Sequence, residues 1–152
     1  MSIRYVHTNI IAKDWRKLSD FYIQVFGCQP LYPERDLSGP WVEELTGIEE
    51  VRIRGMHLQL PGYQEGGPTL EIFQYQPERP RKEEAAIINR QGLGHLAFHV
   101  DDVETVLAGA IAHGGKQLGA VIKKQYETLG LLTAVYVADP EGNFIEIQNW
   151  SR

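Results

Sequence analysis

Cysteine is scarce in this chain, and its scarcity limits the chemistry available. Cys28 is the only cysteine among 152 residues, so no disulfide can form within the chain, and a reducing cytoplasm is the expected compartment. Cys28 directly follows a glycine and has no second cysteine nearby, which favours a packing role over a nucleophilic one. The length suits one domain and is sufficient to bury a core.

An excess of basic residues and a long apolar run are also missing. The 20 acidic residues outnumber the 15 Lys and Arg, giving a net charge of -5, which argues against a nucleic-acid surface. No apolar run approaches the roughly 18–20 residues of a membrane span. The apolar fraction of 43% and charged fraction of 23% are ordinary for a globular protein. We therefore expect a folded protein that binds neither nucleic acid nor membrane.

The chain contains two similar halves, each typical of a β-α-β-β-β module. Apolar periodicity predicts helices over Trp15–Phe26 and Val103–Ala112, the first capped by Asp14 and the second by Asp101 or Asp102. The expected strands are Arg4–Ile11, Gln29–Pro33, Val51–Leu60 and Thr69–Tyr75, then His95–Val100, Lys116–Ile122, Leu132–Ala138 and Asn143–Asn149. The predicted class is α+β, a single domain of module 1 (about 1–80) and module 2 (about 92–152) joined by a linker.

The spacing of histidine, glycine and glutamate supports an internal repeat. His7 lies 20 residues before Gly27 and His95 lies 20 before Gly115, while Gly67 and Gly142 each lie four residues before a glutamate, Glu71 or Glu146. Each half thus has a histidine on its opening strand and a glutamate on its closing strand.

Two segments do not repeat. The acidic segment Glu34–Glu50 contains Pro40 and Gly47, which predict one short helix between them. The other segment, Gln76–Gly94, links the halves, and its part Lys82–Arg90 is a possible helix. Each segment is either a solvated connection or a lid over a pocket.

Strand alternation places the four candidate ligands away from the aliphatic face that would pack on the helices. These candidates are His7, Glu71, His95 and Glu146. Their face also carries Tyr5, Phe73, Tyr75, Ala97, Tyr136 and Phe144. This mixture favours a concave pocket over a simply solvated face. Two imidazoles with two carboxylates suggest one divalent ion per site, and the residue types fit Ni, Co, Mn, Fe or Zn alike.

Five segments of the chain resemble the vicinal oxygen chelate superfamily. They are His7-Thr8, Asp14 with Phe21-Tyr22-(x)4-Gly27, Leu70-Glu71-Ile72, the run from Gly94 to Asp102, and the run from Asp139 to Glu146. This group includes glyoxalase I, methylmalonyl-CoA epimerase, extradiol dioxygenases and bleomycin-binding proteins. The resemblance implies paired βαβββ modules forming a curled mixed sheet around a metal cleft, within one chain or in a homodimer, with the ligands at the four positions above.

The glutamate at the fourth ligand position favours the glyoxalase–epimerase branch. Dioxygenases of the group typically use two histidines and one carboxylate, whereas Glu71 fills the remaining position here. Ile11 and Tyr75 stand where bacterial glyoxalase I usually has an arginine and an asparagine that hold glutathione, which argues against glutathione. Glu50 is a possible counterpart of the second base of the epimerase, or else an exposed acid.

The resulting hypothesis is a metal-dependent lyase, isomerase or epimerase that acts on a small carbonyl substrate through an enediolate. By resemblance, Glu146 is the first choice of base and Glu71 the second. The expected pocket residues are Tyr75, Phe73, Tyr136, Phe144 and Glu50, although core packing suits the aromatics almost equally. The alternatives are an Fe(II) extradiol-type dioxygenase and a metal-free small-molecule binding (resistance) protein.

Other polar residues are weaker candidates. His57 has an uncertain face because Gly55 could mark a bulge that switches it. His99 lies on the pocket rim or on the surface. The cations Arg52, Arg54, Lys123 and Lys124 either bind an anionic substrate group or lie on a solvated face.

Overall fold

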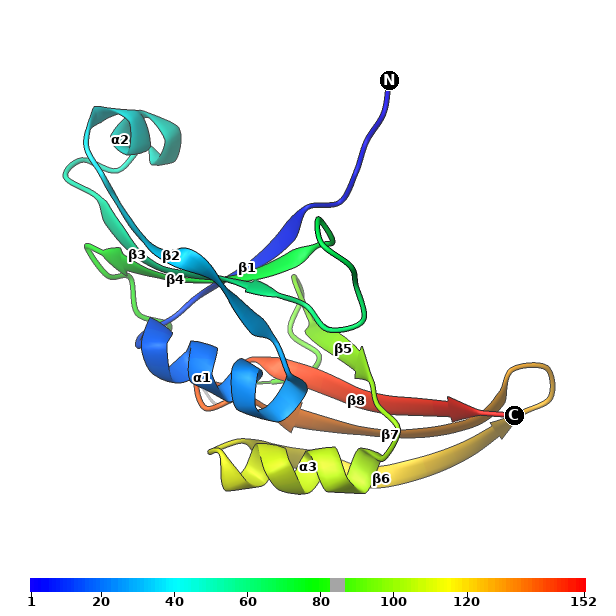
Figure 1. Ribbon diagram of the computed structural model, residues 1–152. Coiled ribbons are helices and arrows are strands. Elements are labelled where there is room, and N and C mark those ends of the chain that lie inside the picture. Colours follow the sequence, from blue (N-terminus) through cyan, green and yellow to red (C-terminus); the bar gives the residue numbers. More distant parts are fainter. Residues whose placement is uncertain (83–86) are drawn as a thin grey trace. The chain divides into compact units, whose positions relative to one another are not determined.

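The structure, a computed structural model, describes residues 1–82 and 87–152. The chain divides into two compact units, Met1–Lys82 and Glu83–Arg152. Each unit begins with a strand, a helix and a second strand, and its four strands form one mixed sheet (Figure 1). The predicted α+β class of paired βαβββ modules is confirmed.

The first unit has six elements. They are β1 (His7–Ile11), α1 (Trp15–Phe26), β2 (Gln29–Ser38), α2 (Pro40–Thr46), β3 (Arg52–Gln59) and β4 (Thr69–Gln76). The strand order is β1-β4-β3-β2, with β1 parallel to β4 and the other pairs antiparallel. The helices α1 and α2 lie on opposite faces of this sheet (Figure 1).

The second unit has the same order without the extra helix. Its elements are β5 (His95–His99), α3 (Val103–Ala112), β6 (Lys116–Tyr126), β7 (Gly130–Ala138) and β8 (Phe144–Ser151). The strand order β5-β8-β7-β6 repeats that of the first unit. Both edge strands also contain a register shift. In β2 the shift lies between Leu31 and Arg35, and in β6 it lies between Leu118 and Ile122.

The apolar faces of the two sheets form the cores, as strand alternation predicts. Leu70 and Ile72 of β4 are buried, as are Ile145 and Ile147 of β8. The helix α1 contributes the large buried side chains Leu18, Phe21 and Tyr22. Cys28 is buried too, and burial raises the pKa of its thiol to about 12, which agrees with the expected packing role.

The helix caps agree with the prediction in both units. Asp14 caps α1, and Gly27 ends it in the left-handed conformation at φ 72°. Asp102 caps α3, and the chain leaves this helix through Gly114, which takes the left-handed conformation at φ 96°, and Gly115. Gly115 is small for another reason, since a Cβ there would lie 2.8 Å from the Ala110 carbonyl oxygen.

The short helix predicted in the 34–50 segment is present as α2, and it is anchored to the sheet. Val42 is 1% exposed and packs with Val51 and Ile53, while Phe73 and Tyr75 lie against this cluster. Val42 thus ties α2 to the sheet, so the segment is not wholly a solvated connection. The helix α2 lies at one end of the first sheet, on the face opposite α1 (Figure 1).

The linker segment gives no support to the predicted helix over Lys82–Arg90. Residues 83–86 lie outside the described part of the chain, and Lys82 and residues 87–90 are not helical. Among the helices of residues 1–82 and 87–152, none is long and apolar enough to cross a membrane.

Candidate metal and catalytic site

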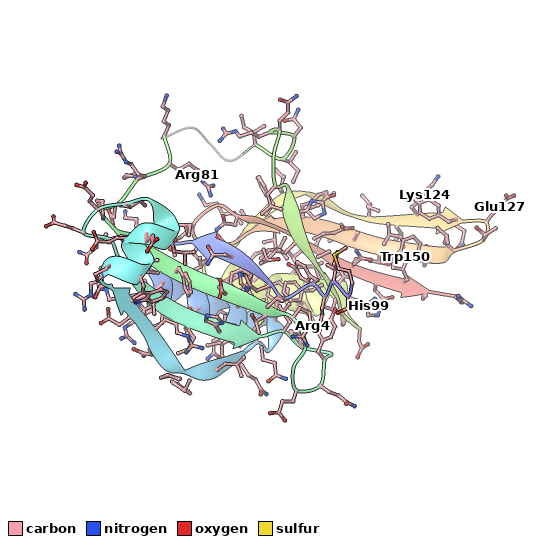
Figure 2. All side chains as sticks on the ribbon, turned by 90° about the horizontal axis from the view of Figure 1, so that it is seen from above. Arg4, Arg81, His99, Lys124, Glu127 and Trp150 are labelled. Carbon is pink, nitrogen blue, oxygen red and sulfur yellow. The ribbon has the colours of Figure 1, made fainter. Side chains whose placement is uncertain are left out.

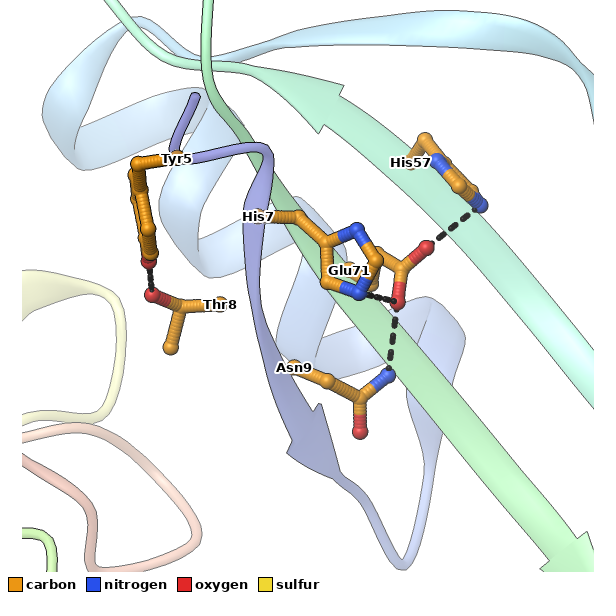
Figure 3. Close-up of polar contacts among 6 residues, drawn as sticks. All are labelled: Tyr5, His7, Thr8, Asn9, His57 and Glu71. Atoms are coloured by element: carbon orange, nitrogen blue, oxygen red, sulfur yellow. Dashed lines mark hydrogen bonds and ion pairs between the residues drawn. The ribbon is translucent and has the colours of Figure 1, made fainter. Parts of the chain in front are cut away.

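Glu71 is the buried carboxylate at the centre of the first unit. It lies in the middle of β4 and is only 6% exposed. His7 Nε2 lies 3.1 Å from its Oε1, and the Asn9 amide donates to the same oxygen at 3.2 Å (Figure 3). His57 Nε2 lies 2.9 Å from its other oxygen, Oε2. Three side chains from two neighbouring strands thus satisfy a carboxylate that burial would otherwise destabilise.

His57 was not among the predicted ligands, and the structure places it directly opposite Glu71. The pairing of β3 with β4 runs without a shift from Arg52 to Gln59, so Gly55 marks no bulge in this pair. A Cβ at Gly55 would lie 2.1 Å from the Ile72 carbonyl oxygen, so glycine permits a close approach there. Uninterrupted alternation along β3 would have placed His57 on the ligand face.

Opposing effects act on the pKa of His57. Burial lowers this pKa below the usual range, Glu71 opposes the shift, and Arg35 and His7 lower the pKa further. Arg35 pairs with Gly55 in the sheet register, and within the described chain it forms no ion pair.

The second unit presents an equivalent but looser pair. His95 Nε2 lies 3.4 Å from Glu146 Oε2, and the two side chains are 34% and 19% exposed. The Tyr136 ring packs edge-on against the His95 ring with centroids 5.0 Å apart. Glu146 is therefore more accessible than Glu71 and has one close polar partner among the described residues.

The predicted pocket residues divide between wall and core positions. Phe73 and Tyr75 are partly buried against the α2 cluster, and the His57 ring lies 5.6 Å from the Phe73 ring. Tyr136 lies beside His95, and Phe144 pairs with His95 in the strand register.

Glu50 does not join the Glu71 group. It is exposed in the turn before β3 at φ 56°, and its backbone N–H donates to the Glu43 carboxylate at 3.1 Å. His57 lies toward the opposite end of β3, so nothing in the first unit brings Glu50 to the carboxylate of Glu71.

Three of the cationic candidates, Arg52, Lys123 and Lys124, are exposed, and Arg54 is half-buried. Arg52 forms a bidentate pair with the exposed Asp36, with N···O distances of 2.9 and 2.8 Å. Lys124 lies near the end of the hairpin of β6 and β7, which also carries Glu127 (Figure 2). His99, at the end of β5, is exposed.

The donor set of the two units suits a divalent ion of intermediate hardness. Each unit supplies one imidazole and one carboxylate from its first and last strands. Within residues 1–82 and 87–152, no group of three or more His, Cys, Asp or Glu side chains is arranged to hold a metal. In the first unit the two imidazoles approach opposite oxygens of Glu71.

Comparisons with known proteins agree with this architecture. The family model for glyoxalase, described as the glyoxalase/bleomycin resistance protein/dioxygenase superfamily, matches residues 4–147. No curated protein sequence matches the chain.

Solved structures share the fold at low sequence identity. A glyoxalase family protein from Bacillus cereus superposes with a TM-score of 0.76 at 18% identity, covering 99% of this chain and 94% of that one. The trypanothione-dependent glyoxalase I of Leishmania major gives 0.59 at 21% identity, covering 97% and 87%. A glyoxalase/bleomycin resistance protein/dioxygenase family enzyme from Burkholderia phytofirmans gives 0.56 at 22%, covering 95% and 97%.

Proposed function

Because this chain belongs to the glyoxalase/bleomycin resistance protein/dioxygenase superfamily, we propose that it is a divalent-metal-dependent lyase, isomerase or epimerase. Its substrate is a small carbonyl compound that reacts through an enediolate. The observation that carries the proposal is the repeated His–Glu pair on the first and last strands of both units, His7 with Glu71 and His95 with Glu146. Members that only bind a ligand have no use for a complete donor set of this kind.

His7, Glu71, His95 and Glu146 hold the metal in this proposal. The fit rests on donor chemistry, because all four side chains present a nitrogen or oxygen to their partner at 3.1 or 3.4 Å. When bound, the ion supplies Lewis-acid stabilisation of negative charge on the substrate oxygens. Glu146, the more exposed of the two carboxylates, takes a proton from the carbon beside the carbonyl. It returns the proton to the same or the adjacent carbon.

The side chains of Ile11 and Tyr75 favour a substrate other than a glutathione adduct. Ile11 is 54% exposed at the end of β1, and Tyr75 packs against the α2 cluster. Neither side chain offers the charged or amide contacts that would hold a glutathione carboxylate. We therefore assign the protein a compact carbonyl substrate with two adjacent oxygens.

Elemental analysis tests the metal. The untagged protein is stripped, reloaded separately with Ni, Co, Mn, Fe and Zn, and compared with His95→Ala and with the matched control His99→Ala. We expect near-stoichiometric metal in the unaltered protein and in His99→Ala, and loss in His95→Ala. If no loading condition gives bound metal, the proposal is wrong and a metal-free binding protein becomes the better interpretation.

Glu146→Gln tests the base. The amide keeps the size of the side chain but cannot accept a proton, so turnover should fall by roughly 10²–10⁴-fold while the fold persists. Substrates are screened among 2-oxo thiohemiacetals, acyl-CoA epimers and ketols. Full turnover in the variant would contradict the assigned role, and oxygen consumption with a catechol would instead indicate a dioxygenase.

A further inference from the structure

Glu71 and Glu146 occupy equivalent positions in the two units, yet their surroundings differ. Glu71 has three close polar partners, His7, Asn9 and His57. Among the described residues, Glu146 has one close polar partner, His95, at the longer distance of 3.4 Å. Its side chain is 19% exposed, against 8% for Glu71.

The residues paired with each glutamate on its two neighbouring strands explain the difference in surroundings. Asn9 and His57 flank Glu71 on the neighbouring strands. The same positions beside Glu146 hold Ala97 and Tyr136. Alanine offers no side-chain donor, and the Tyr136 hydroxyl makes no hydrogen bond among the described residues, its ring packing instead on His95.

We propose that His57, together with Asn9, is a positioning residue that locks the Glu71 carboxylate in one orientation, whereas Glu146 is left free to move. This division of roles rests on the proposed function and deepens it. Glu71 keeps Oε1 directed to His7 and remains a fixed ligand, and Glu146 is the carboxylate that carries the proton.

The physical basis is the pairing of Oε2 with His57. A carboxylate can rotate and exchange its two oxygens, and the contact of 2.9 Å between His57 Nε2 and Oε2 holds one of them. Oε1 is then shared between His7 and Asn9. Removing a hydrogen-bond partner behind a ligand typically weakens metal binding by 10–100-fold.

Side-chain dynamics test, without metal or substrate, whether His57 holds the Glu71 carboxylate in one orientation. In protein labelled at glutamate Cγ, NMR relaxation should give Glu71 a higher order parameter than Glu146. His57→Leu should lower the order parameter of Glu71, whereas His57→Gln should retain it, because the glutamine amide can donate to the same oxygen. Equal order in the two glutamates, or no change in His57→Leu, would overturn the proposal.

The reciprocal test introduces the two hydrogen-bond donors of the first unit into the second unit. The double variant Ala97→Asn with Tyr136→His places the two donors of the first unit beside Glu146. Its order parameter should rise toward that of Glu71, with the circular dichroism spectrum unchanged. An unchanged order parameter in a folded double variant would contradict the proposal.

Cobalt titration tests whether the contact between His57 and Glu71 also affects metal affinity. The dissociation constant for Co(II) should rise 10–100-fold in His57→Leu and change little in His57→Gln and in His113→Leu, whose imidazole instead contacts the Gly109 carbonyl of α3. Equal Co(II) affinity in His57→Leu and the unaltered protein would overturn the positioning role. Absence of Co(II) binding in the unaltered protein would overturn the proposed function instead, and the relaxation experiment would still decide the lock.

Discussion

Gly55 sets the geometry around Glu71 although it has no side chain. It pairs with Phe73 in the sheet, and an added Cβ would lie 2.1 Å from the Ile72 carbonyl oxygen and 2.7 Å from Phe73 Cδ1. The backbone carbonyl cannot move aside as the tip of a flexible side chain could. A glycine two residues before His57 therefore keeps β3 close enough to β4 for the imidazole to reach the carboxylate.

The substitution Gly55→Ala should destabilise the protein. Overpacking against a backbone atom typically costs about 1–3 kcal/mol, and the strands must separate to accept the methyl group. We expect a lower midpoint of urea unfolding with an unchanged slope.

Gly109→Ala is the matched control for this prediction. Gly109 lies inside α3, and nothing lies within 4 Å of an added Cβ, so the alanine should stabilise the helix by about 0.5–1 kcal/mol. Opposite shifts of the two midpoints are expected. A stabilised Gly55→Ala variant would show that β3 and β4 do not approach as closely as described.

The same glycine explains why His57 was missed. Alternation along a strand needs only residue order, and it predicts the common face of His7 and Glu71. A glycine inside a strand signals either a bulge or a close approach. Only the partner strand distinguishes these meanings, and the sequence does not show which atoms of that strand lie opposite Gly55.

At the scale of elements, α2 depends on a single apolar anchor. The helix spans seven residues, and Val42 is its only buried side chain, while Trp41 and Leu45 are exposed. Such a short helix has little stability of its own. Its place over Phe73 and Tyr75 therefore comes from the packing of Val42.

Val42→Ala should release α2 without unfolding the sheet. The change removes roughly 1.5 kcal/mol of apolar burial, which is large for one helix of two turns. Hydrogen exchange should quicken at the α2 amides and remain slow in α1. Uniform loss of protection in both helices would contradict local release.

The cap of α3 predicts a pH dependence. Hydrogen bonds from the Thr105 backbone N–H and hydroxyl lower the pKa of Asp102 below its usual range. The charged cap therefore stabilises the fold above the ordinary aspartate pKa of about 3.9, and this contribution is lost as the pH falls through the lowered value. Asp102→Asn keeps an acceptor oxygen but does not titrate.

Urea unfolding at a series of pH values measures the effect. The difference in unfolding free energy between the unaltered protein and Asp102→Asn should be largest at neutral pH and shrink below about pH 4. A difference that stays constant across this range would show that the charge of Asp102 contributes nothing to the cap.

Helices were easier to predict than strand ends, for a physical reason. The bounds of α1 and α3 follow from caps and periodicity within the segment itself, and both agree with the structure. The strands β2 and β6 extend to Ser38 and Tyr126, beyond the predicted ends at Pro33 and Ile122. They continue past an irregularity in the pairing, where the hydrogen bonds come from distant strands.

At the scale of the whole molecule, the two units share their strand order and the His–Glu pair but differ in the residues beside the glutamate. Both keep the strand order and the His–Glu pair. The first unit has Asn9 and His57 beside its carboxylate and carries the additional helix α2, and the described part of the second unit has no counterpart of these features. A repeat can keep its donors while its surroundings change, because the ligand positions are fixed by strand alternation and the surroundings by single side chains.

A metal held by both pairs should stabilise the whole protein, and each unit should be needed for the effect. At a free metal concentration 100 times the dissociation constant, binding contributes about 2.7 kcal/mol, or roughly 5–11 °C in Tm for a chain of this size. Differential scanning calorimetry with Zn should give this shift in the unaltered protein. His7→Ala in the first unit and His95→Ala in the second should each abolish it, since either change removes one of the four donors that we propose. If His7→Ala alone removes the shift and His95→Ala keeps it, the metal belongs to the first unit and the four-donor assignment is wrong.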